Sequence, residues 1–155
     1  MCCSCTHAGL FNFTQGDFLQ TFAKKHNISM RGHNLIWVAH NPPWLVSQAP
    51  GVSSAQLDSI MKEHIESVAA HYKGRVYSWD VVNEGIIDVP SPWFAHRCSN
   101  WTCALKNTTN IYSKGEAVDW TKAGDTSASY VEKAFRYAHA IDPTARLFYN
   151  VSFSS

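Results

Sequence analysis

The stretch YSWDVVNEGI, from Tyr77 to Ile86, decides how this sequence is interpreted. Its first part is typical of a strand buried in a sheet. The stretch then stops abruptly on the amide of Asn83 and the carboxylate of Glu84. Neighbouring side chains of a strand point to opposite sides, so both groups reach one pocket only where the strand ends and the backbone turns. We therefore expect Glu84 at the mouth of a cleft, because burying it unpaired would be costly.

Helix and strand patterns alternate along the rest of the chain. Apolar residues at helical spacing predict helices over residues 15–26, 55–72 and 126–142. The first helix is expected to turn Phe18, Leu19, Phe22 and Ala23 inward, and Ser54 is expected to cap the second.

Three apolar runs predict strands, over residues 29–37, 75–84 and 145–150. Prolines and small polar residues predict loops over residues 41–44 and 47–51. Residues 86–125 contain prolines, glycines and scattered aromatics, and are predicted to form a long structured loop.

Because helices separate the strands, successive strands are expected to run parallel with right-handed crossovers. Two architectures fit, an open doubly wound sheet and a (β/α) barrel. A nucleotide-binding sheet needs a glycine-rich turn, and the sequence has neither GxGxxG nor a P-loop. Polar residues instead follow the strands, at Trp37–His40, Asn83–Glu84 and Asn150. This pattern is typical of the active face of a barrel, so an α/β fold of the TIM-barrel type is predicted.

Three motifs resemble one enzyme family. RGHNLIW (31–37), WDVVNE (79–84) and ARLFYN (145–150) together are similar to glycoside hydrolase family 10, the endo-β-1,4-xylanases. The resemblance covers residues 9–150, which we interpret as one catalytic domain, with residues 1–8 and 151–155 as non-native or truncated ends. It implies a partial (β/α)8 TIM barrel, about strands 3 to 5 with their helices. The implied activity is hydrolysis of β-1,4-xylosidic bonds in xylan with retention.

The resemblance also implies roles for individual residues. Glu84 matches the general acid/base, and Asn83 matches the residue that bonds the sugar hydroxyl next to the anomeric carbon. His33 and Trp37 match residues that line the subsite where the bond breaks. Asp80 matches a buried carboxylate that supports the site. No cofactor is implied, and the expected partner is the polysaccharide xylan.

The sequence departs from the family pattern in two respects. After Trp37 the family usually has His, a small residue and Gln, whereas this chain has Val38-Ala39-His40, which changes two sugar-contacting groups. The family's nucleophile, a Glu on the seventh strand, has no match here. A retaining glycosidase needs two carboxyl groups about 5–5.5 Å apart. We therefore expect a truncated fragment that is inactive alone and monomeric when complete.

Alternative interpretations remain open. The chain is also compatible with another retaining β-glycosidase, with a non-catalytic sugar-binding relative, or with an inactive fragment. The structural alternatives are a solvated loop carboxylate for Glu84 and plain barrel core for Trp37, while His33 taken alone is more typical of a hydrogen-bonded core histidine. A metal site is poorly supported, because the eight histidines form no HExxH motif.

Composition limits the partners and the compartment. The formal net charge is +1 and no apolar run is long enough to span a membrane, so neither nucleic acid nor a membrane is expected as a partner. No signal peptide is visible in the chain. Cys98 and Cys103 are candidates for a disulfide. We expect an extracellular protein, because the chain has five glycosylation sequons, at Asn12, Asn27, Asn100, Asn107 and Asn150.

Overall fold

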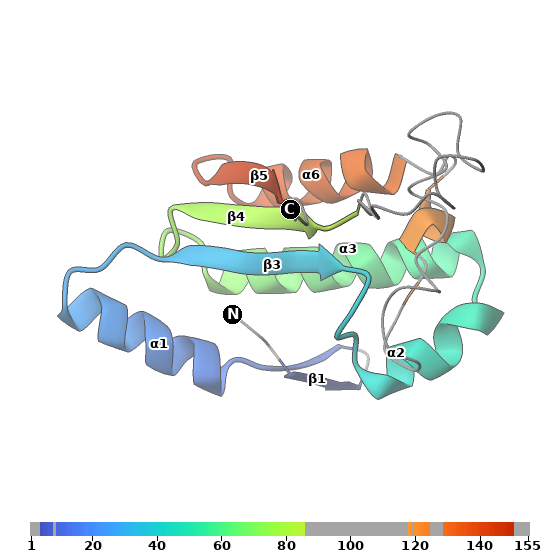
Figure 1. Ribbon diagram of the computed structural model, residues 1–155, viewed down its shortest axis with the longest axis horizontal. Coiled ribbons are helices and arrows are strands. Elements are labelled where there is room, and N and C mark those ends of the chain that lie inside the picture. Colours follow the sequence, from blue (N-terminus) through green and yellow to red (C-terminus); the bar gives the residue numbers. More distant parts are fainter. Residues whose placement is uncertain (1–3, 8, 86–117, 119, 125–128, 151–155) are drawn as a thin grey trace, which may run out of the picture.

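Three parallel strands form the centre of the structure (Figure 1). The computed structural model describes residues 4–7, 9–85, 118, 120–124 and 129–150. Strands β3 (Arg31–Trp37), β4 (Ser78–Asn83) and β5 (Arg146–Asn150) lie in the order β3-β4-β5. Every residue of the central strand β4 is buried, as expected for a strand covered on both faces. The three predicted strands and their parallel arrangement are confirmed.

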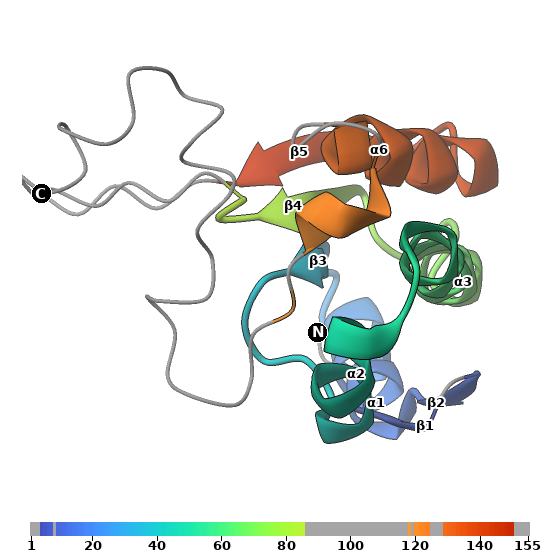
Figure 2. The same cartoon turned by 90° about the vertical axis from the view of Figure 1, so that its right-hand side faces the viewer.

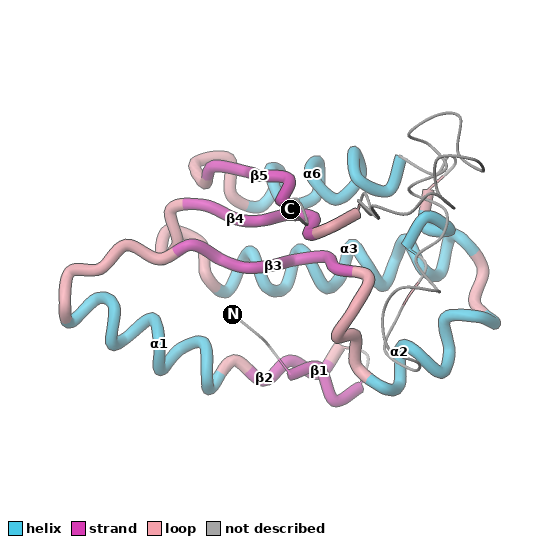
Figure 3. Tube along the Cα trace, viewed as in Figure 1, coloured by secondary structure: helices cyan, strands magenta, loops and turns pink. Residues whose placement is uncertain are grey.

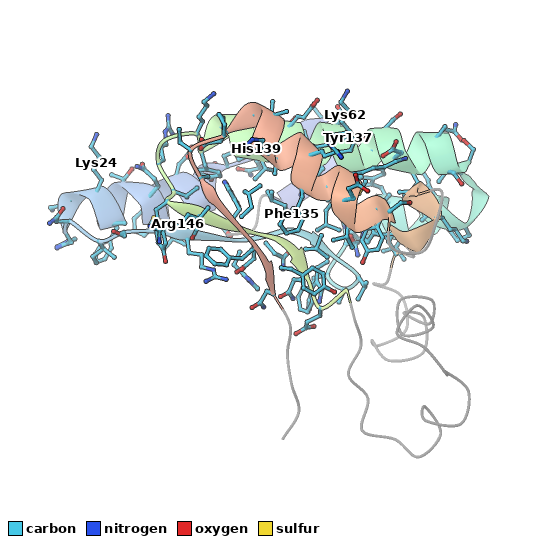
Figure 4. All side chains as sticks on the ribbon, turned by 90° about the horizontal axis from the view of Figure 1, so that it is seen from above. Lys24, Lys62, Phe135, Tyr137, His139 and Arg146 are labelled. Atoms are coloured by element: carbon cyan, nitrogen blue, oxygen red, sulfur yellow. The ribbon has the colours of Figure 1, made fainter. Side chains whose placement is uncertain are left out.

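Two helices cover one face of this sheet. α3 (Ser54–His71) and α6 (Ser129–Ile141) lie side by side against it (Figure 2). Lys62 of α3 lies over the ring of Tyr137 of α6, 5.7 Å from its centroid (Figure 4). The helices share one apolar core with β4, to which Leu57, Met61, Ile65, Val68, Trp79, Val81, Val82, Tyr130, Ala134 and Ala138 belong.

The N-cap of α3 differs from the prediction. The cap is Ser53, whose Oγ accepts a hydrogen bond from Gln56 N at 3.3 Å. Gln56 Oε1 in turn accepts from Ser53 N at 2.8 Å, which completes a capping box. Ser54 is already the first helical residue, so the prediction that it caps the helix is wrong by one position.

The first predicted helix is present, but its predicted inward face is largely wrong. α1 (Thr14–Lys25) buries Ala23, whereas Phe18 is 71% exposed and Leu19 and Phe22 are each 50% exposed. The helix meets α3 through a different side, where Asp17 Oδ1 lies 2.6 Å from Nε2 of His71. Within the described residues no element covers the apolar side of α1, so helical spacing identifies an apolar face without identifying what covers it.

Several short elements have no counterpart in the prediction. β1 (Ser4–His7) and β2 (Leu10–Asn12) pair antiparallel and lie beyond the β3 edge of the sheet (Figure 3). Residues 43–44 and 47–51, predicted as loops, belong to α2 (Pro43–Gln48) and the 3-10 helix η1 (Ala49–Gly51). Proline is well tolerated in the first turn of a helix, and here it starts α2. None of the described helices has the length and apolarity that crossing a membrane requires.

Candidate active site

The carboxyl ends of the three parallel strands lie in register. Trp37 of β3 pairs with Asn83 of β4, and Asn83 pairs with Asn150 of β5. Asn150 Nδ2 donates a hydrogen bond to Asn83 Oδ1 at 2.5 Å. The polar strand ends noted in the sequence therefore meet at one edge of the sheet, the edge where α/β folds bind their ligands.

Glu84 stands immediately beyond β4, where the backbone turns. Its φ of +50° lies in the left-handed region, which residues other than glycine seldom adopt. Its N–H donates to the carbonyl of Asn150 at 2.8 Å, which ties the turn to β5. Its half-buried side chain accepts a hydrogen bond at Oε2 from the indole Nε1 of Trp37, at 2.9 Å. We call Trp37, Asn83, Glu84 and Asn150 the strand-end cluster.

A second polar group lies earlier along the same strands. Asp80 is only 3% exposed, and its Oδ2 lies 2.9 Å from Nδ1 of His33. Both Asp80 oxygens also accept hydrogen bonds from Arg31. The guanidinium of Arg31 lies over Phe148 at 4.6 Å from the ring centroid, so this residue links β3, β4 and β5. The His33 side chain is 50% exposed, which places it at the surface of the sheet and not in the core.

These contacts keep Asp80 ionised. Burial acts to raise the pKa of Asp80, but the hydrogen bonds from Arg31 and His33 and the charge of Arg31 outweigh it, so the pKa lies below its usual value. The hydrogen bond to Asp80 in turn raises the pKa of Arg31. An ionised Asp80 accepts the Nδ1–H of His33, which selects one tautomer of the imidazole ring.

Sequence reasoning missed two residues, Trp120 at the carboxyl edge and Arg31 in the Asp80 group. Trp120 Nε1 donates to the carbonyl of Trp37 at 2.9 Å, although the two residues lie 83 positions apart in the sequence. No local sequence pattern predicts a contact between residues so far apart. Arg31 had a usable signal, because it lies two residues before His33 and alternate residues of a strand share a face.

A cavity of about 400 Å³ adjoins the strand-end cluster along β3. Its walls include the rings of Trp37, His40, Trp44 and Trp120. His40, at φ +56°, is exposed and its ring centroid lies 4.8 Å from that of Trp37. Aromatic rings of this kind suit stacking against the apolar faces of sugars.

Other sequence candidates are only partly placed by the structure. Cys98, Cys103, Asn100 and Asn107 lie outside the described residues. Asn12 and Asn27 are both exposed, whereas Asn150 belongs to the strand-end cluster. In the part of the chain that the structure describes, no three His, Cys, Asp or Glu side chains converge to hold a metal ion.

Comparison with known proteins decides the family. Residues 4–152 match the family model described as Glycosyl hydrolase family 10. The chain belongs to glycosyl hydrolase family 10. The family resemblance inferred from the motifs is therefore confirmed.

Xylanases similar to this chain extend well beyond it. The β-1,4-xylanase of Dictyoglomus thermophilum is 36% identical over 145 residues, which is 91% of this chain and 32% of that protein. Endo-1,4-beta-xylanase C of Phanerodontia chrysosporium is 35% identical over 94% of this chain and 31% of its own length. The chain thus spans about a third of the length of the relatives it matches.

Solved family 10 structures confirm the fold class. Native xylanase 10B of Thermotoga maritima superposes with a TM-score of 0.68 at 29% identity, over 92% of this chain and 36% of that one. Xylanase 10B of Thermotoga petrophila RKU-1, solved in complex with xylobiose, gives 0.69 at 29% identity, over 93% and 36%. The parallel sheet and its helices are therefore part of a TIM barrel.

Proposed function

We propose that this chain carries the acid/base part of a retaining endo-1,4-β-xylanase site, with Glu84 as the general acid/base. The observation that carries the proposal is the position of Glu84. Its half-buried carboxylate lies at the carboxyl end of a barrel strand and is held by the indole of Trp37 at 2.9 Å. Barrel enzymes place their catalytic groups at this end of the strands.

The proposed chemistry uses Glu84 twice. It first protonates the leaving oxygen of the glycosidic bond, and then removes a proton from the water that releases the sugar. Proton transfer requires the carboxyl group to stay within hydrogen-bond reach of the reacting oxygen. The contact with Trp37 supports this role because it restricts the orientation of the carboxylate.

His33, Trp37 and Asn83 are proposed to bind the xylan chain, and Asp80 to support the site. Asn83 presents its amide at the same edge as Glu84, where Asn150 orients it. Asp80 orients His33 through a 2.9 Å contact. These contacts support the roles that the family resemblance implies for the four residues.

The nucleophile is proposed to lie outside this chain. Asp80 is engaged by Arg31 and His33, and Asp17 and Asp58 are engaged by side chains of the helices. These three aspartates thus have structural partners, and the resemblance assigns the nucleophile to none of them. A retaining glycosidase needs both carboxyl groups, so we expect the 155-residue chain alone not to hydrolyse xylan.

The test uses a completed barrel in which residues 4–152 replace the matching part of the Thermotoga maritima xylanase. Glu84→Gln keeps the side-chain shape and removes the proton donor. Activity on xylan is expected to fall about 10²–10⁴-fold, because a sugar leaving group needs a proton. An aryl xylobioside with an activated phenol should still give a burst of glycosyl-enzyme. Turnover should then stall and restart with azide.

The matched control is Glu66→Gln on α3, which is expected to keep the parental rate on both substrates. If the Glu84 variant shows neither burst nor azide rescue, Glu84 is not the acid/base. A parental chimera that binds xylan but cleaves neither substrate would favour the non-catalytic sugar-binding alternative.

A further inference from the structure

Two hydrogen bonds tie a remote segment to the backbone that follows β3. Trp120 is only 3% exposed, and its Nε1 donates to the carbonyl of Trp37 at 2.9 Å. Val118, 1% exposed, donates its N–H to the carbonyl of Val38 at 3.0 Å. These carbonyls lie at the point where the chain leaves β3. Val118 and Trp120 therefore supply hydrogen bonds that the sheet does not provide there.

Asn41 binds the same two carbonyls. Its Nδ2 donates to Val38 O at 2.9 Å and to Trp37 O at 3.2 Å. The Trp37 carbonyl thus receives one donor from its own turn and one from Trp120. The backbone at Trp37 cannot shift without lengthening at least one of these bonds.

This backbone carries the side chain that holds Glu84. Trp37 is the last residue of β3, and its register with Asn83 fixes it on the sheet side. On the other side Trp120 fixes its carbonyl. We propose that Trp120 is a positioning residue, whose N–H bond to the Trp37 carbonyl keeps the indole of Trp37 against the carboxylate of Glu84.

Trp120 can act in this way because it is itself firmly anchored. It begins the 3-10 helix η3 (Trp120–Ala123) and belongs to the common apolar core. The carbonyl of Ala123 accepts from Lys133 Nζ at 3.1 Å, and the same Nζ lies 3.0 Å from Asp58 Oδ2. Residues of α3 and α6 thus hold η3 in place, and Trp120 connects them to the strand-end cluster.

The test replaces Trp120 in the 155-residue chain by benzothienylalanine, which keeps the ring shape and lacks the N–H. The readout is the indole N–H resonance of Trp37, assigned through its loss in Trp37→Phe. In the parent this resonance is expected to shift as Glu84 ionises, and Glu84→Gln should abolish that shift. With the analogue at 120, the pH-dependent shift should shrink. Exchange of the Trp37 indole proton should become about fivefold faster, as the loss of one hydrogen bond implies.

The control is Trp44→Phe, which changes another ring of the same cavity and is expected to leave the pH-dependent shift and the exchange rate of the Trp37 indole unchanged. An unchanged pH-dependent shift and exchange rate of the Trp37 indole N–H in the analogue would overturn the proposal. So would a general rise in amide exchange across β3 and β4, because the bond would then serve the whole fold.

The positioning role of Trp120 rests on the proposed function only for its effect on catalysis. Different measurements test the positioning role and the acid/base role of Glu84. Trp37 exchange reports the position of the indole whether or not Glu84 is catalytic, whereas azide rescue reports the role of Glu84. In the completed barrel Trp120→Phe is expected to lower kcat on xylan several-fold with little change in KM. A rise in KM alone would indicate a substrate-binding role and contradict positioning.

Discussion

His64 is a titratable side chain that the proposed chemistry does not use. It lies on α3 beside Phe11, with their ring centroids 5.9 Å apart. Burial lowers the pKa of His64 from 6.5 to about 4, and a hydrogen bond with the backbone at Leu35 opposes this effect only in part. The folded chain therefore favours the neutral ring at pH values where the unfolded chain binds a proton.

This gives a pH dependence with a definite sign. Because the folded pKa lies below the unfolded one, the contribution of His64 to stability is complete above pH 6.5 and is lost as the pH falls towards about 4. His64→Met removes the titrating group and keeps a similar volume. Urea midpoints measured from pH 7 to pH 4 should fall more steeply for the parent than for this variant. His139→Met on the exposed side of α6 should keep the parental slope, and parallel curves for parent and His64→Met would contradict the assignment.

At the scale of elements, the pairing of β3 with β4 depends on one glycine. Gly32 pairs with Trp79, and the indole of Trp79 lies across it. A Cβ at Gly32 would lie 2.1 Å from Cε3 of Trp79, closer than atoms can approach. The large ring of Trp79 is 1% exposed and has little room to move, so the strand pair depends on glycine at this position.

Gly32→Ala should therefore destabilise the protein, by about 3 kcal/mol, the upper part of the range for overpacked cores. Gly51→Ala is the matched control, because no atom lies within 4 Å of its added Cβ and its backbone is not left-handed. Thermal unfolding of both variants in the completed barrel makes the comparison. Equal melting temperatures for the two variants would show that Trp79 moves aside easily.

Elements whose pattern is local were predictable, and contacts between distant elements were not. The strands and the two helices over the sheet follow from the spacing of apolar residues, and the turn at Glu84 follows from two polar residues that a buried strand cannot hold. The contact of Trp120 with Trp37 depends on how a long segment returns to the sheet, which periodicity does not encode. The exposed face of α1 is a similar case, because an apolar stripe does not specify its partner.

At the scale of the whole molecule, α1 exposes apolar side chains that we expect further parts of a barrel to cover. Phe18, Leu19 and Phe22 form an exposed stripe on α1, and β3 is an outer strand of the described sheet. The chain spans about a third of the xylanases it matches. We therefore expect this stripe to be solvent-exposed in the 155-residue chain and covered in a completed barrel. Burial determines whether an apolar side chain stabilises a protein or promotes its association.

The double substitution Phe18→Ser and Phe22→Ser should therefore have opposite effects in the two settings. In the 155-residue chain it should reduce self-association, measured by sedimentation velocity, because it removes exposed apolar surface. In the completed barrel it should lower the melting temperature, because truncating a buried Phe costs about 3–5 kcal/mol.

The matched control is Gln20→Ser with Lys24→Ser, which has the same spacing on α1 and replaces polar side chains. It should change neither the association of the chain nor the melting of the barrel by a comparable amount. Helix propensity does not explain a large effect of the Phe substitutions, because serine and phenylalanine have similar values, and the control loses only a few tenths of a kcal/mol of propensity per residue. If the Phe18 and Phe22 variant left the melting temperature of the completed barrel unchanged, the stripe would not be a barrel contact. Phe18, Leu19 and Phe22 would then be exposed in the completed barrel as well as in the 155-residue chain, and their exposure would need an explanation other than a missing part of the barrel.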